Sequence, residues 1–204
     1  MNKHQIIMIW GWEAFDNQED YLRSLESYPL DIGESYKSWK WWLISGLSDE
    51  FECIRVTMPD TQNSYYPAWK IWFEKYFQYI WDQKLILIGH SLGGIFLTKY
   101  LSENIFPRHI DFLHLVSPVF DNTGLQWEST ATFAIDTKKL ENIPNQVSEI
   151  HLWHSKDDPV VPFMHSEKYH NEFQTSILHT FENRWHFTNQ SHFVELFLEI
   201  QKQG

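Results

Sequence analysis

Leu85–Leu101 reads LILIGHSLGGIFLTKYL, and this stretch decides the fold. An aliphatic run ends at Gly89, a second apolar run begins at Leu92, and Ser91 lies between Gly89 and Gly93. A strand that turns at once into a helix strains the backbone at its apex, and flanking glycines let the two elements approach closely. The pattern G-x-S-x-G therefore predicts a nucleophile elbow that raises the Ser91 hydroxyl at the C-terminal edge of a sheet.

The remaining sequence alternates between strand-like and helix-like segments. Short β-branched or aliphatic runs predict six strands, at Gln5–Trp10, Phe51–Thr57, Leu85–Ile88, Phe112–Ser117, Glu149–Trp153 and Ser176–Phe181. Segments of helical period predict helices at Glu19–Glu26, Tyr36–Leu47, Pro67–Trp81, Leu92–Leu101, Phe163–Phe173 and Gln190–Gln201. This alternation is typical of an α/β fold, with mostly parallel strands and helices on both faces of the sheet.

A serine hydroxyl becomes a nucleophile when a base removes its proton and an acid orients that base. In this fold the acid and then the histidine follow the serine along the chain. Asp157 and Asp158 follow the fifth predicted strand, and His186 and His192 follow the sixth. We favour Asp158 because the residue before a proline is held in extended backbone, while Asp157 remains an alternative that could also serve a turn. We favour His186 because it lies nearer its strand, whereas His192 is expected in the first turn of the last helix.

The sequence resembles the small α/β hydrolases of the retinoblastoma-binding serine hydrolase and bacterial YdeN-like family. The similarity extends over nearly the whole chain. It rests on IWGW (9–12), WKWWL (39–43), VTMPDT (56–61), AWKIWFEKY (68–76), LILIGHSLGG (85–94), HSKDDPVVP (154–162) and WHFTN (185–189). Carried over residue by residue, the resemblance implies Ser91 as nucleophile, Asp158 as acid and His186 as base.

We therefore expect residues 1–204 to form a single α/β-hydrolase domain, without a separate cap domain and with strands in the order 2-1-3-4-5-6. The expected activity is that of a carboxylesterase-like serine hydrolase that cleaves a small ester-like acyl substrate through an acyl-enzyme, with no cofactor. Thioester and amide cleavage are open variants of this chemistry. The competing interpretation is a catalytically weak or inactive protein that keeps the fold and acts as an interaction module.

The loop after the first strand should complete the site. We expect an oxyanion hole formed by the N–H groups of Trp12 and Leu92. The family usually has small residues at this loop, whereas this chain has Trp12 and Glu13, so the Glu13 carboxylate must point away from the hole. The segment Glu13–Ser35 also looks longer than in relatives. As a hypothesis, aromatic residues on loops that face Ser91 form the substrate pocket together with Trp12: Phe120, Trp127 and Trp185.

Composition narrows the classes of partner. A formal charge of −11 and the lack of a Lys/Arg cluster argue against nucleic acid as a partner, and no apolar run approaches the roughly 18 residues of a membrane span.

The N-terminal apolar run is followed by acids and resembles a strand, not a signal peptide. One cysteine, Cys53, favours a reducing compartment, and we expect a cytoplasmic location. Seven of the 11 histidines lie between His151 and His192, but their spacing does not match a metal site. The sequence contains no pattern that indicates a protein partner.

Overall fold

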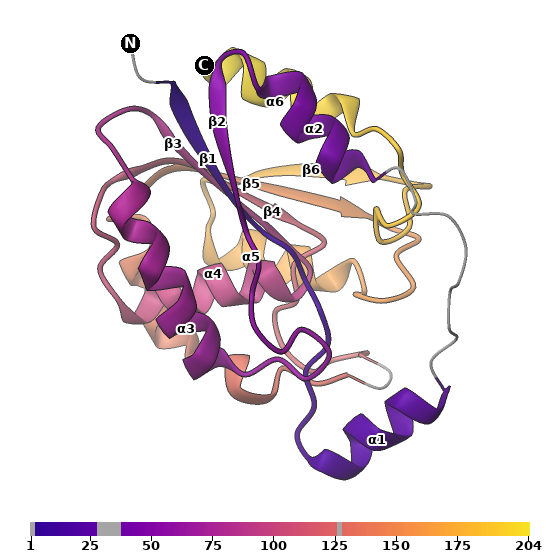
Figure 1. Ribbon diagram of the computed structural model, residues 1–204. Coiled ribbons are helices and arrows are strands. Elements are labelled where there is room, and N and C mark those ends of the chain that lie inside the picture. The colour runs from indigo at the N-terminus through magenta and orange to yellow at the C-terminus, as the bar shows by residue number, and fades with distance from the viewer. Residues whose placement is uncertain (1–2, 28–37, 126–127) are drawn as a thin grey trace.

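A six-stranded sheet forms the centre of the computed structural model, which describes residues 3–27, 38–125 and 128–204. The strands are β1 (His4–Ile9), β2 (Phe51–Val56), β3 (Leu85–His90), β4 (Ile110–Val116), β5 (Val147–Ser155) and β6 (Ile177–Phe181). Neighbouring strands pair in parallel in the order β2-β1-β3-β4-β5-β6 (Figure 1). This is the predicted order of the α/β-hydrolase fold, which is thereby confirmed.

Helices cover both faces of this sheet. Helices α2 (Trp39–Leu47) and α6 (Val194–Gln203) lie on one face, and α3 (Tyr66–Glu74), α4 (Leu92–Glu103) and α5 (Met164–Glu172) lie on the other (Figure 1). Residues of β3 alternate between the two cores, since Ile86 and Ile88 pack with α2 and α6, while Leu85 and Leu87 pack with α3 and α4. All six residues of β3 are buried, as expected of a central strand that is covered on both faces.

The third and the last of the predicted helices have clearly different bounds in the structure. The segment Pro67–Trp81 was expected to be one helix, but α3 ends at Glu74 and continues as a 3₁₀ helix, η1 (Lys75–Tyr79). The tighter turn is accompanied by an edge contact of Phe77 with Phe106, with ring centroids 4.8 Å apart.

The last helix, α6, begins at Val194 and not at Gln190. The Gln190 carbonyl accepts a hydrogen bond from Trp39 N–H (2.9 Å), and Phe193 is buried against the Trp39 ring. Contacts with α2 thus delay the start of α6, and His192 lies before the helix rather than in its first turn.

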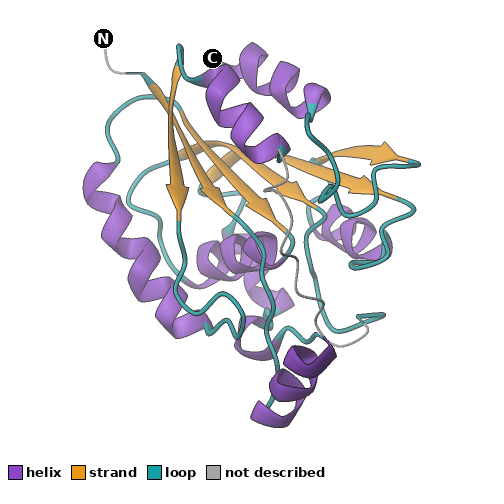
Figure 2. Cartoon of the chain, turned by 45° about the vertical axis from the view of Figure 1, so that its right-hand side comes forward, coloured by secondary structure: helices purple, strands orange, loops and turns teal. Residues whose placement is uncertain are grey.

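Long loops gather at the C-terminal edge of the sheet. The first carries α1 (Gln18–Ser27), which has no buried residue and lies beyond the ends of the strands in both views (Figure 1, Figure 2). The connection between β4 and β5 contains two 3₁₀ helices, η2 (Ala131–Phe133) and η3 (Thr137–Asn142). Within the described ranges, no helix has both the length and the apolarity needed to cross a bilayer.

Candidate active site

The turn between β3 and α4 has the strained geometry that the sequence predicts. Ser91 has φ 56° and ψ −122°, a backbone conformation that residues with a side chain rarely adopt. Its N–H donates to Val116 O (2.9 Å), which ties the apex to β4. A Cβ at Gly89 would lie 2.6 Å from Gly93 O, so the strand and helix approach closely only because this position is glycine. The Ser91 side chain does not cap α4 and therefore remains available for other contacts.

The loop after β1 packs directly against this turn. A Cβ on Gly11 would overlap Ser91 Cβ and would lie 2.7 Å from Leu92 N. The Glu13 N–H donates to Thr61 O (3.3 Å), whereas among the loop hydrogen bonds of the described residues none uses the N–H of Trp12 or Leu92. Sequence reasoning missed the role of Gly11, although its place directly after the first strand in IWGW was a usable signal.

Asp158 is the carboxylate that meets a histidine. Its Oδ2 lies 2.8 Å from His186 Nδ1 and 3.3 Å from His154 Nε2. Its Oδ1 accepts hydrogen bonds of 2.9 Å from both Val160 N and Val161 N. Burial opposes ionisation, but hydrogen bonds from His154, His186 and the backbone outweigh it and hold the pKa of Asp158 below its usual range. The fully buried side chain is therefore a carboxylate.

Asp157, the alternative acid, forms hydrogen bonds with other residues than the histidine. It is exposed, and its Oδ1 accepts hydrogen bonds from Ser155 Oγ (2.5 Å) and Trp185 N (3.0 Å). Ser155 Oγ in turn accepts a hydrogen bond from Arg184 N (2.9 Å). Asp157 therefore fastens the loop before His186 to the end of β5, and it does not pair with the imidazole.

The loop that carries His186 is held on both sides of the histidine. His90 Nε2 donates to His186 O (2.9 Å), and Trp39 Nε1 donates to Phe187 O (2.8 Å). Trp185 and Phe187 both have positive φ, 51° and 56°. These contacts set the direction of the His186 ring, which is 5% exposed.

The second candidate, His192, is not part of this arrangement. Its ring is exposed, its Nδ1 lies 2.7 Å from Ser191 Oγ, and it makes an edge contact with Trp42 at 4.9 Å. The structure thus brings His186 to Asp158 and leaves His192 on the surface beside α2.

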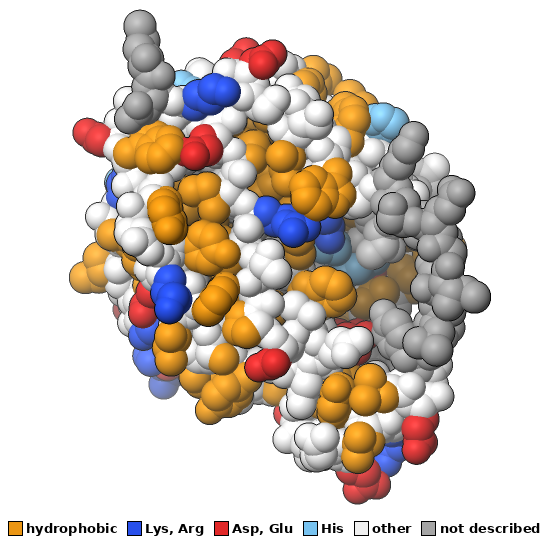
Figure 3. All heavy atoms as spheres, in the orientation of Figure 1, with side chains coloured by type: hydrophobic (Ala, Val, Ile, Leu, Met, Phe, Trp, Pro, Cys, Tyr) orange, Lys and Arg blue, Asp and Glu red, His pale blue; other side chains and the backbone are white. Residues whose placement is uncertain are grey.

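Ser91 and His186 line one pocket of about 580 Å³. Figure 3 shows a hollow on this face, with basic side chains (blue) at its rim and histidine (pale blue) beside them. Among the described residues, no hydrogen bond joins the Ser91 hydroxyl to His186, and in hydrolases this contact often tightens only when substrate binds. The pocket could accept a small molecule whose carbonyl carbon reaches Ser91.

Charged side chains of both signs line this pocket. Glu13 and Glu128 come from the two long loops, and Lys40 and Arg55 come from α2 and β2. Burial, with a smaller contribution from the charge of Glu13, raises the pKa of Glu128 to about 7. Burial also raises the pKa of Glu13, and a hydrogen bond with Ser24 of α1 opposes that rise. Glu13 therefore lines the pocket with a side chain that burial makes harder to ionise.

The aromatic residues of the pocket differ from those expected. Phe120 is buried in the core, with its ring 4.8 Å from Tyr169 and its N–H bonded to His165, and it is absent from the described pocket wall. Trp185 is 55% exposed and is likewise absent from that wall, and Trp127 lies outside the described residues. Among the described residues, the tryptophans that line the pocket are Trp10, Trp12 and Trp41.

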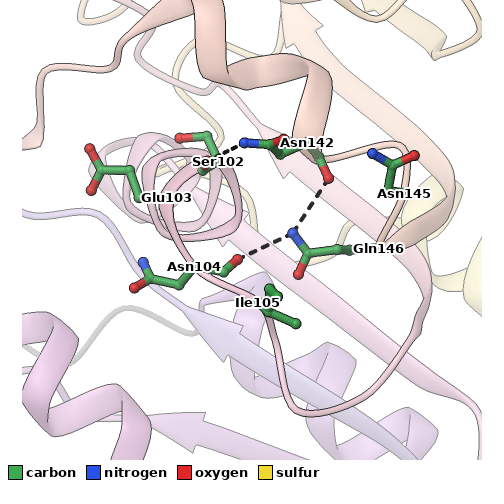
Figure 4. A pocket seen from close by; sticks show the side chains of 7 residues that line it. All are labelled: Ser102, Glu103, Asn104, Ile105, Asn142, Asn145 and Gln146. Atoms are coloured by element: carbon green, nitrogen blue, oxygen red, sulfur yellow. Dashed lines mark hydrogen bonds between the residues drawn. The ribbon is translucent and has the colours of Figure 1, made fainter.

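A second pocket is lined mainly by polar side chains that hydrogen bond to the backbone of neighbouring elements. It lies between the C-terminal end of α4 and the segment formed by η3 and the residues after it. Asn142 Nδ2 donates to Ser102 O (2.9 Å), and Gln146 Nε2 donates to Asn104 O (3.2 Å) (Figure 4). These amides are used to join the two helices. Across the described residues, no group of three or more His, Cys, Asp and Glu side chains could hold a metal ion.

The parallel sheet, the strained serine turn and the histidine–carboxylate pair define an α/β hydrolase. The pattern of the serine hydrolase family matches residues 34–198, so the chain belongs to that family. It is 28% identical over 165 residues to the serine hydrolase RBBP9 of Rattus norvegicus, covering 80% of this chain and 84% of the relative.

Solved structures share the fold at lower sequence identity. The ydeN gene product from B. subtilis has a TM-score of 0.72 at 17% identity, with 98% of each chain covered. The methylesterase protein MES16 from Arabidopsis has a TM-score of 0.60 at 12% identity, again with 98% of each chain covered. MGS-M1, an α/β hydrolase enzyme from a deep-sea metagenome library, has a TM-score of 0.61 at 14% identity over 98% of this chain and 81% of its own.

Proposed function

We propose that this serine hydrolase cleaves small ester-like acyl substrates through Ser91, His186 and Asp158. The observation that carries the proposal is the 2.8 Å contact between His186 Nδ1 and Asp158 Oδ2, beside a strained serine on the same pocket. A buried carboxylate at Nδ1 keeps the proton on that nitrogen, so Nε2 is left as the base.

In the first half of the reaction, Ser91 Oγ attacks the ester carbonyl carbon while His186 Nε2 takes the hydroxyl proton. Asp158 stabilises the imidazolium that forms. The tetrahedral intermediate then collapses, the bond to the leaving alkoxide breaks, and His186 returns the proton to that oxygen. The products of this half are an alcohol and an acyl-enzyme on Ser91.

Water completes the cycle by the same route. His186 removes a proton from water as the water oxygen attacks the acyl carbon. The tetrahedral intermediate then collapses, the bond between the acyl carbon and Ser91 Oγ breaks, His186 returns the proton to Oγ, and the carboxylic acid leaves. The free N–H groups of Trp12 and Leu92 are the proposed donors to the oxyanion in both halves. Removing one such donor in other hydrolases costs about 10² to 10³ in turnover.

Covalent labelling distinguishes a catalytic serine hydrolase from a protein that keeps the fold but acts only as an interaction module. We expect a fluorophosphonate probe to label the native protein and to fail after heat denaturation or in Ser91→Ala. Turnover of an activated short-chain ester should fall by at least about 10³ in Ser91→Ala and in His186→Gln, because the triad acts as a unit. His192→Gln is the matched control and should stay within about threefold of wild type. A folded protein that never labels would favour the interaction module.

A further inference from the structure

Two cationic side chains on the pocket wall have no part in the chemistry described above. Lys40 comes from the first turn of α2, and Arg55 comes from the C-terminal half of β2. We propose, on the basis of the proposed function, that Lys40 and Arg55 bind an anionic group of the substrate, so that the enzyme selects esters that carry a carboxylate.

Lys40 is held by aromatic rings and not by an acid. Its Nζ lies 4.8 Å from the ring centroid of Trp10 and 6.0 Å from that of Trp39. The lysine ion pairs within the described part of the chain all involve other lysines. A cation on an aromatic face can still accept an anion, because the ring occupies one side of the ammonium only.

Arg55 adds a second cation at the pocket mouth. Its guanidinium carbon lies 4.6 Å from the ring centroid of Trp41, which also lines the pocket and is 55% exposed. The arginine ion pairs of the described residues involve Arg23, Arg108 and Arg184. Within the described ranges the Arg55 guanidinium thus has no acidic partner, and a ligand carboxylate can bind such a group with two parallel hydrogen bonds.

The environment of Lys40 favours an incoming anion. Burial lowers its pKa to about 8, and among the residues that the structure describes no carboxylate offsets this effect. A desolvated cation without a partner destabilises the free protein, so a ligand carboxylate that reaches it restores the missing interaction.

The two acids of the pocket come from other elements than the two cations. Burial and, to a smaller extent, the charge of Glu13 raise the pKa of Glu128, while burial lowers the pKa of Lys40. We call Lys40 and Arg55, from α2 and β2, the cation wall, and Glu13 and Glu128, from the two long loops, the acid wall. An anionic group would be repelled by the acid wall and drawn to the cation wall, which would orient the substrate over Ser91.

Two substrate pairs test this assignment and distinguish where the charge is carried. The pair 4-nitrophenyl monoadipate and 4-nitrophenyl hexanoate differs by a carboxylate on the acyl chain. The pair 4-acetoxybenzoate and its methyl ester differs by a carboxylate on the leaving group. In each pair we compare kcat/KM for the anionic and the neutral ester. We expect Lys40→Met to lower this ratio at least tenfold in one pair, chiefly through KM, and Lys40→Arg to restore most of it.

The matched control is Lys75→Met, because Lys75 Nζ also lies over a tryptophan, 5.5 Å from the Trp72 centroid, but outside the described pocket wall. It removes the same charge and should leave the ratio unchanged, which excludes a general effect of net charge. Arg55→Gln, at an exposed position, should lower the ratio at least threefold, and it carries the test if Lys40→Met does not fold. Unchanged ratios in both pairs, or a wild-type preference for cationic esters, would overturn the inference.

A failure of the proposed function gives a different result. If wild type cleaves no ester of either pair, the proposed function is refuted. Equilibrium binding of monoethyl adipate, followed by tryptophan fluorescence, then tests the cation wall without turnover. Weaker binding in Lys40→Met than in wild type would support the wall, and equal binding would refute it.

Discussion

Replacing Asp158 with asparagine tests the relation between the buried acid and the base. Asparagine has the shape of aspartate, so its Oδ1 can still accept the 2.9 Å hydrogen bonds from Val160 N and Val161 N. The amide Nδ2 then occupies the place of Oδ2, 2.8 Å from His186 Nδ1. An amide donates a hydrogen bond, so His186 must place its proton on Nε2, where it cannot accept the proton of Ser91.

The expected magnitude follows from the tautomer. Loss of the acid with retained geometry lowers kcat by about 10³ to 10⁴, which corresponds to about 4 to 5.5 kcal/mol of activation free energy. The effect on folding is smaller, because the two backbone hydrogen bonds survive and only the contacts with His154 and His186 change. We expect the free energy of unfolding to fall by less than about 2 kcal/mol.

The assay combines steady-state turnover of 4-nitrophenyl butyrate with unfolding in urea. Asp157→Asn is the matched control, since it makes the same chemical change at the adjacent, exposed residue, whose Oδ1 can still accept from Trp185 N. It should lower kcat by less than about tenfold. A folded Asp158→Asn protein with turnover within tenfold of wild type, or a larger loss in Asp157→Asn, would refute the reasoning.

Two further predictions concern packing and pH. Gly11→Ala places a Cβ against Ser91 Cβ, so we expect turnover to fall at least about 10² and stability to fall by about 1 to 3 kcal/mol; wild-type turnover in this variant would contradict the close packing. Burial lowers the pKa of His179 to about 4, so its contribution to stability is complete above the unfolded value near 6.5 and is lost as pH falls from there toward 4. The raised pKa of Glu128 has the opposite effect, since it makes the protein more stable as pH falls. The contribution of His179 is therefore isolated by comparing wild type with His179→Phe. We expect the melting temperature of His179→Phe to fall less than that of wild type between pH 6.5 and 4.5. Parallel pH curves for the two proteins would count against this role of His179.

The sheet and the serine turn were predictable because their signals are local. A run such as LILIG has apolar residues on both faces and therefore predicts a buried strand without any knowledge of its neighbours. The glycines around Ser91 indicate the close approach of strand and helix that the turn requires. The order of the strands follows from the same pattern, once the chain is assigned to the fold. The preference for Asp158 and His186 also rested on local cues, the proline after the acid and the nearness of the histidine to its strand.

The pocket wall was harder to predict because it depends on contacts between distant segments. Lys40 lies in an aromatic helix, and nothing in WKWWL indicates that its ammonium group reaches the serine pocket. Phe120 follows β4 on a loop that was expected to face Ser91, but contacts with Tyr169 and His165 turn it into the core. The predicted start of α6 is wrong for the same reason. It depends on the hydrogen bond from Trp39 N–H to the Gln190 carbonyl, and the sequence around neither residue indicates this contact.

Three of the six described non-glycine residues with positive φ are the proposed nucleophile and the two neighbours of the proposed base: Ser91, Trp185 and Phe187. This conformation costs residues with a side chain about 1 to 3 kcal/mol each. Trp185 is 55% exposed, so Trp185→Gly would relieve part of that cost with little loss of packing, whereas Phe187 is buried and its replacement by glycine would remove core contacts. A laboratory selection for heat tolerance alone should therefore enrich Trp185→Gly, and the selected proteins should be more stable but should position the His186 imidazole less accurately.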